Sequence, residues 1–199
     1  MDKLIKHIVI VGGGSAGWLS AAILAKKFHS SNSDIKVSLI ESQEFASIGV
    51  GEGTWPTMRE TLFNIGIDEK DLITLCDASY KQGSQFNRWR TGQDGDSYLH
   101  PFTAPRAFEQ FDLAPYWLEN SSQSYAQSVC FQTSLCQQYM APKLPLDKNY
   151  QGFANYGYHL DAGKFGQLLQ KPLQSTKKSP GICWPDFNVK CEMKSSPSS

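Results

Sequence analysis

The sequence has no surplus of charge of either sign, because nineteen basic residues meet nineteen acidic ones in 199 residues. A protein that binds nucleic acid or an anionic membrane by bulk charge needs an excess of lysine and arginine. Long hydrophobic runs are also missing, and nothing approaches the roughly 20 apolar residues of a membrane span. We therefore expect neither a nucleic-acid partner nor a membrane partner.

Cysteines are few and lack the spacing of metal ligands. The five are Cys76, Cys130, Cys136, Cys183 and Cys191. No secretion signal accompanies them, since the N-terminal residues lead directly into a strand-like run. Ordinary thiols in a reducing compartment are the best interpretation, and we expect a cytoplasmic protein without a metal site.

The residues that are present can build a core along most of the chain. Hydrophobic residues make up 40% of the sequence and aromatic residues 12%, which excludes wholesale disorder. Residues 171–199 differ, because six Ser, five Lys and four Pro fill more than half of this segment. We therefore divide the chain into a domain at 1–170 and an atypical tail at 171–199, expected to be disordered or the product of a shifted reading frame.

The first forty residues carry a strand–helix–strand pattern. Residues 7–11 are a continuous β-branched run, typical of a strand buried on both faces of a parallel sheet. Apolar residues then recur at helical spacing over residues 16–28, and residues 35–40 alternate as a second strand that ends at Glu41. This order predicts an α/β fold with a parallel sheet.

A glycine fingerprint, Gly12-x-Gly14-x-x-Gly17, lies between the first strand and the helix. The first glycine permits a tight turn, the second lets a pyrophosphate approach the backbone, and the third lets the helix pack against the strand. The helix N-terminus offers free N–H groups to phosphates, and Glu41 would accept hydrogen bonds from a ribose. The pattern predicts a dinucleotide site for FAD or NAD, with a simple strand-to-helix turn as the alternative.

Three further features are ambiguous on their own. Alternate glycines in residues 48–57 leave bare backbone for a flat ring, or form a flexible loop. His100 and Phe102 could enclose a planar ligand, although a packed core cluster is the more frequent explanation. His159 and Asp161 suggest acid–base chemistry, but a strand end and a helix cap are commoner roles.

Taken together, these segments resemble a known family. Five motifs occur in the order and spacing of flavin-dependent halogenases: residues 12–18, 48–54, 80–81, 100–102 and 158–161. From about Lys6 to Gln170, the chain resembles the N-terminal part of the tryptophan halogenase family. The resemblance implies a Rossmann-like FAD-binding fold of the flavin monooxygenase and halogenase type, here incomplete, with an aromatic-rich substrate-side segment.

The resemblance also implies a reaction. Such enzymes use FADH2 from a separate flavin reductase and oxidise chloride or bromide to hypohalous acid. A lysine, matching Lys81 here, passes electrophilic halogen to an electron-rich aromatic such as tryptophan or another indole. Without the resemblance, Lys81 would be read as an ordinary surface lysine. In the full-length family a homodimer is also expected.

The resemblance assigns roles residue by residue. The ADP portion of FAD is expected at Gly12, Gly14, Ser15, Ala16, Gly17 and Glu41. A strap between the flavin and the substrate would contain Gly51, Glu52 and Gly53. His100 and Phe102 match residues that flank the indole.

The chain also departs from the family pattern. Family members are more than twice as long, and their Trp-x-Trp-x-Ile-Pro motif and catalytic glutamate have no counterpart here. We therefore expect this chain to be an inactive fragment when it stands alone. Two alternatives stay open, a flavin-dependent aromatic monooxygenase that hydroxylates its substrate and a non-catalytic truncated product.

Overall fold

The computed structural model describes residues 5–31, 34–42, 51–120, 122–174 and 188–189. Its residues form two compact units. The first unit contains residues 1–52, 60–78 and 160–199, and the second contains residues 53–59 and 79–159. Within the described ranges, no helix has the length and apolar character that crossing a membrane requires.

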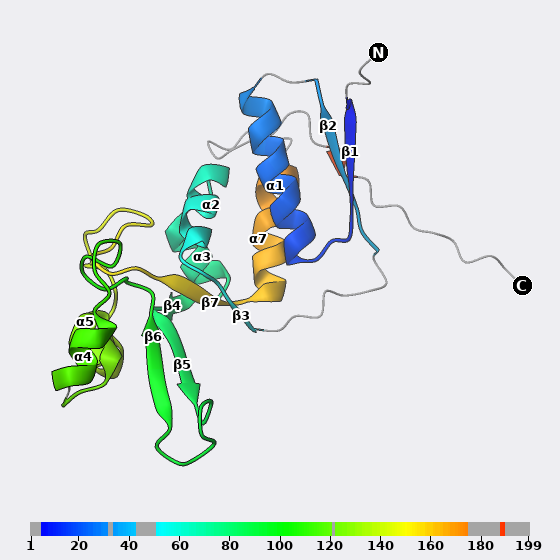
Figure 1. Ribbon diagram of the computed structural model, residues 1–199. Coiled ribbons are helices and arrows are strands. Elements are labelled where there is room, and N and C mark those ends of the chain that lie inside the picture. The colour runs from blue at the N-terminus through cyan, green and yellow to red at the C-terminus, as the bar shows by residue number, and fades with distance from the viewer. Residues whose placement is uncertain (1–4, 32–33, 43–50, 121, 175–187, 190–199) are drawn as a thin grey trace, which may run out of the picture. The chain divides into compact units, whose positions relative to one another are not determined.

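The first unit opens with the expected strand–helix–strand order. Strand β1 (His7–Val11) leads into helix α1 (Ser15–Ser30), and strand β2 (Lys36–Ile40) follows. β1 and β2 pair in parallel, and β8 (Asn188–Val189) pairs in parallel with β2, which places β2 in the middle. Figure 1 shows α1 beside these strands and beside helix α7 (Ala162–Gln174). The parallel α/β prediction is confirmed.

Strand β1 is not buried on both faces, and this expectation was wrong. Val9 and Val11 are 48% and 82% exposed, whereas Val37 and Leu39 of β2 are buried. Successive side chains of a strand point to opposite faces. Helix α1 contacts β1 and β2, and in the described part of the chain the face that carries Val9 and Val11 stays uncovered.

Two short helices and α7 complete the described part of the first unit. Helix α2 (Thr57–Ile65) ends before Gly66, whose φ of +79° suits a glycine at a helix end. Asp68 caps α3 (Glu69–Leu75) by accepting a hydrogen bond from the Lys70 backbone N–H. The core contains the following buried residues: Trp18, Ala21, Leu39, Leu72, Cys76, Phe165, Leu168 and Leu169.

Helix α7 is longer than the sequence pattern suggested. Residues 161–170 have the pattern of a short amphipathic helix, whereas the helix continues to Gln174. Residues 175–187 and 190–199, which make up most of the segment treated as a tail, lie outside the described residues. The short strand β8 falls within that segment. The composition of residues 171–199 predicted neither the C-terminal end of α7 nor strand β8.

The described residues of the second unit form a hairpin, three helices and part of a small sheet. In the small sheet, β7 (Gly157–Asp161) lies between β3 (Gly51–Gly53) and β4 (Ser79–Lys81). The remaining elements are β5 (Gly83–Asn87), β6 (Ser97–Pro101), α4 (Ala114–Asn120), α5 (Tyr125–Val129) and α6 (Gln132–Gln137). β5 and β6 pair as an antiparallel hairpin. Most of these elements fall within residues 98–158, an aromatic-rich stretch whose sequence has no strong periodicity and so predicts no particular element.

Candidate functional site

The turn between β1 and α1 has the backbone geometry of the glycine fingerprint. Gly12 has a φ of +115°, which is rare for residues with a side chain, and its N–H donates to the Ile40 carbonyl at 2.9 Å. A Cβ atom on Gly17 would lie 1.9 Å from the Gly12 carbonyl oxygen. The third glycine is therefore required for the close approach of helix and strand, as the sequence predicted.

The second glycine leaves the open space that a phosphate needs. A Cβ atom on Gly14, which caps α1, would meet nothing within 4 Å. The first N–H groups of a helix have no partner within it, and no acidic residue occupies the first turn of α1. Ala16 lies exposed in that turn, whereas the Ser15 hydroxyl donates to the Ala162 carbonyl at 3.3 Å. This end of α1 fits the diphosphate of FAD, with Ser15 offering its backbone.

Glu41 lies over the same loop, directly after β2. Its Oε2 accepts a hydrogen bond from Nε1 of Trp18 at 3.2 Å, and Trp18 is fully buried. A Cβ atom on Gly13 would lie 1.8 Å from that oxygen. The carboxylate is thus fixed against bare backbone, where a ribose hydroxyl could also reach it. Trp18, which ends the first motif of the family resemblance, was given no structural role from the sequence, and its indole N–H positions the acid.

The expected strap residues are exposed on β3. Gly51, Glu52 and Gly53 are all exposed. The preceding residues 48–50 lie outside the described residues. The strand is followed by Thr54, which is buried. Its backbone N–H donates to the Tyr158 carbonyl at 2.8 Å, and its hydroxyl accepts from the Tyr158 N–H at 2.9 Å. These two hydrogen bonds to β7 fix the position of the neighbouring Gly53.

Lys81 places its ammonium close to two aromatic rings. Nζ lies 5.6 Å from the ring centroid of Trp55 and 5.5 Å from that of Phe102. The two rings are 5.4 Å apart and tilted by 40°. A cation within about 6 Å of an aromatic centroid is attracted by the ring. The side chain of Lys81 is therefore held at a surface made of aromatic carbon.

His159 shares this location. A Cβ atom on Gly53 would lie 3.1 Å from Nζ of Lys81 and 3.5 Å from Nδ1 of His159. Partial burial and the nearby Lys81 ammonium lower the pKa of His159 below its ordinary value. Both side chains line a cavity of about 420 Å³, together with Leu99 and Tyr139. Asp161, by contrast, has the role of a helix cap and accepts from the Lys164 N–H at 2.8 Å.

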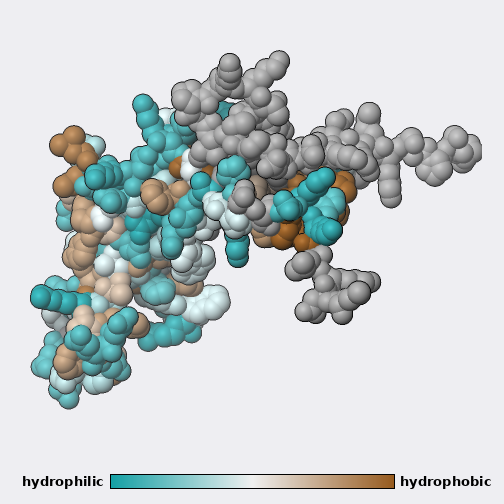
Figure 2. Space-filling model, turned by 90° about the horizontal axis from the view of Figure 1, so that it is seen from above, coloured by the Kyte–Doolittle hydropathy of each residue, from teal (hydrophilic) through white to brown (hydrophobic). Residues whose placement is uncertain are grey.

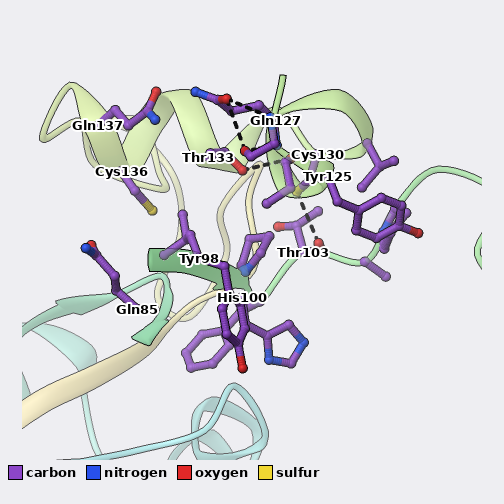
Figure 3. Close-up of a pocket in the computed structure, with 18 of the residues that line it drawn as sticks. Gln85, Tyr98, His100, Thr103, Tyr125, Gln127, Cys130, Thr133, Cys136 and Gln137 are labelled. Atoms are coloured by element: carbon purple, nitrogen blue, oxygen red, sulfur yellow. Dashed lines mark hydrogen bonds between the residues drawn. The ribbon is translucent and has the colours of Figure 1, made fainter. Parts of the chain in front are cut away.

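A larger cavity of about 1010 Å³ contains the predicted substrate residues. His100 and Phe102 both line it, and Leu99 and Tyr139 line both cavities. Figure 3 shows Tyr98 and His100 on the side of β6, with Gln127 and Thr133 on the helical side. None of the described residues that line this cavity is Asp, Glu, Lys or Arg.

A buried amide network fixes the segments on which Phe102 and Lys81 lie. Gln132 is fully buried, and its Oε1 accepts from the Thr103 N–H at 2.7 Å while its Nε2 donates to the Asn155 carbonyl at 2.6 Å. Asn155 in turn donates from Nδ2 to the Phe102 carbonyl at 3.1 Å. The Phe102 N–H donates to the carbonyl of Gln82, next to Lys81. Sequence patterns gave no sign of this network, since its members are far apart in the chain.

The chain is similar to known proteins of one family. The tryptophan halogenase family profile matches residues 7–178. Tryptophan 6-halogenase ThaL of Streptomyces albogriseolus is 32% identical over 187 residues, which are 85% of this chain and 34% of that protein. A crystal structure of tryptophan halogenase from Shewanella frigidimarina is 49% identical with a TM-score of 0.78, covering 86% of this chain and 34% of that one. The flavin-dependent halogenase Xcc4156 of Xanthomonas campestris is 29% identical with a TM-score of 0.70, covering 85% and 33%.

The fold and the glycine turn define a partial Rossmann-like α/β protein of the flavin-dependent halogenase class. The chain belongs to the tryptophan halogenase family. It spans about a third of the length of the curated relatives that it matches.

Proposed function

We propose that this chain supplies the dinucleotide-binding turn and the halogen-carrying lysine of a flavin-dependent halogenase. The observation that supports this most is the position of Lys81, whose ammonium lies at an aromatic surface and lines an open cavity. An isolated surface lysine would have no such surroundings. The turn with Gly12, Gly14 and Gly17, and Glu41 beside it, would hold the ADP portion of FAD.

In this proposal FAD, reduced by a separate flavin reductase, supplies with oxygen the oxidising power that turns chloride or bromide into hypohalous acid. Lys81 receives the electrophilic halogen and presents it to an electron-rich ring. The rings of Trp55 and Phe102 lie beside the ammonium and would define the face that a flat substrate approaches. Positioning of the halogen and of the ring is therefore the contribution of this chain.

The substrate that we propose is an indole ring, as in tryptophan or another indole. The larger cavity suits an uncharged aromatic body, because its described lining consists of aromatic, aliphatic and neutral polar side chains apart from His100. His100 and Phe102 would flank the ring. Any ionised groups of the substrate would have to be bound outside this lining, since an unpaired charge in it would be costly.

We expect the chain on its own to turn over no substrate, because it spans only about a third of its curated relatives. The test therefore uses a chimera in which residues 7–170 replace the matching segment of the Shewanella frigidimarina halogenase. With reduced flavin, oxygen, bromide and tryptophan or indole, we expect a brominated product that disappears when bromide is left out. Hydroxylated product, or turnover that is independent of halide, would favour the monooxygenase alternative and overturn the proposal.

A further inference from the structure

Lys81 and His159 are diagonal neighbours on one face of the β4–β7 pair. In the antiparallel register, Ser79 lies opposite His159 and Lys81 lies opposite Gly157. Diagonal neighbours on the same face of a sheet are within reach of long side chains. Because Gly53 has no side chain to separate them, the two head groups converge on the space beside its Cα atom.

The surroundings of His159 favour its neutral form. Partial burial first, and the Lys81 ammonium second, lower the pKa of His159. The other charged residues of β3, β4 and β7 are Glu52 and Asp161, and neither contributes to this shift. Near neutral pH the ring therefore has one nitrogen with a free lone pair, close to a cation that carries protons.

An ammonium group cannot attack a halogen, because its nitrogen has no lone pair to give. We propose that His159 is the proton acceptor of Lys81 and so produces the amine that takes up halogen. This inference rests on the proposed function, which brings hypohalous acid to Lys81. The proton passes directly or through one water, a reach that general bases use.

The step balances without any further reactant. An N–H bond of the ammonium breaks, its electron pair stays on Nζ, and the proton moves to the imidazole. The amine then attacks the halogen of hypohalous acid, and the oxygen–halogen bond breaks. The hydroxide that leaves takes the proton from the imidazolium and becomes water. His159 returns to its neutral form, and Lys81 carries the halogen as a protonated haloamine, so His159 acts on the substrate only through Lys81.

The experiment uses the full chain, hypochlorous acid, and neither flavin nor substrate. Haloamines are captured with an aryl sulfinate as stable sulfonamides, and peptide mass spectrometry gives the ratio of Lys81 to the exposed Lys70. We expect this ratio at pH 7 to exceed that for the unfolded chain by about tenfold or more, at the low end of general-base effects. His159→Gln should abolish the preference, and the exposed His29→Gln, a matched control, should keep it.

A preference for Lys81 that survives in folded His159→Gln, or no preference in the wild type, would overturn the proposal. The preference for Lys81 should also depend on pH. It should fall as the pH drops through the pKa of His159, because a protonated imidazole cannot accept the proton of Lys81. A second measurement does not depend on halogen chemistry: in Lys81→Met, nuclear magnetic resonance should show the pKa of His159 rising. An unchanged pKa would contradict the coupling. If Lys81 serves only as a hydrogen-bond donor, these tests fail while flavin-dependent bromination in the chimera still succeeds.

Discussion

At the scale of single residues, the site depends on positions where a side chain is missing. Gly53 leaves space for two head groups, and Gly157 allows Thr54 to lie directly against β7. A Cβ atom on Gly157 would lie 2.5 Å from the Thr54 carbonyl oxygen. This clash is with backbone, which cannot rotate away as a flexible side chain could.

Gly157→Ala should therefore destabilise the second unit by about 1–3 kcal/mol, the usual cost of overpacking. Gly166→Ala is the matched control, because a Cβ atom there would meet nothing within 4 Å and alanine favours the helix α7. Urea unfolding followed by circular dichroism measures both. Equal stability of Gly157→Ala and the wild type would contradict the close packing of Thr54 on β7.

His159 also predicts how stability depends on pH. Its pKa in the folded chain is lowered, so below the ordinary value of about 6.5 the unfolded chain binds this proton more readily. The free energy of unfolding should then decrease as the pH falls from about 6.5 through the folded pKa, and this contribution should be fully present above 6.5. Urea unfolding across this range should give a shallower decline for His159→Gln than for the wild type or His29→Gln. Parallel curves would contradict a lowered pKa.

At the same scale, the sequence identified some of these residues and not others. Gly12 and Gly17 follow from their spacing, because backbone geometry dictates the residue type. Trp55 and Gln132 could not be found in this way. Their roles arise from contacts with Phe102 and Asn155, which are distant in the chain.

At the scale of elements, the β1–α1 turn separates two effects that the fingerprint combines. A side chain on Gly17 would collide with the backbone of Gly12, whereas a side chain on Gly14 would enter open space. The first change alters the packing of the helix on the strand. The second leaves that packing unchanged and occupies the space expected for phosphate.

We therefore predict different outcomes for Gly17→Ala and Gly14→Ala. Gly17→Ala should lower the melting temperature of the chain and weaken the binding of ADP, a fragment of FAD. Gly14→Ala should weaken ADP binding with little change in melting temperature. Calorimetric titration and thermal unfolding provide the two measurements. If both variants bind ADP like the wild type, the dinucleotide site is not at this turn.

Helices and strands were predictable where the hydrophobic periodicity of the sequence was strong. The first strand, the first helix and the second strand agree with the structure to within a few residues. The hairpin of β5 and β6 and the short helices α4 to α6 were not predicted, since elements of five to seven residues carry too few turns or alternations for a clear period.

At the scale of the whole molecule, many large apolar side chains of the described residues are exposed rather than packed in a core. Figure 2 shows apolar residues reaching the surface on the face in view. Large side chains are exposed in the aromatic-rich stretch, among them Phe108 at 66% and Tyr116 at 68%. Residues 98–158 therefore expose several large apolar side chains.

The isolated chain should consequently bind a hydrophobic dye and self-associate more than the chimera does, because exposed apolar patches favour association. Dye fluorescence and light scattering at matched concentrations test this. Phe108→Ser with Tyr116→Ser should reduce both signals in the isolated chain, while Lys70→Met, a change at an exposed charged residue, should not. If the isolated chain and the chimera give equal signals, this surface is not normally covered.

The central claim is that Lys81 carries the halogen. The most direct test places Lys81→Met in the chimera and measures brominated product and the oxidation of reduced flavin in the same reaction, with Lys70→Met as the control. We predict that bromination is lost in Lys81→Met while flavin oxidation continues, and that Lys70→Met retains both. Brominated product at the wild-type level from Lys81→Met would contradict the account.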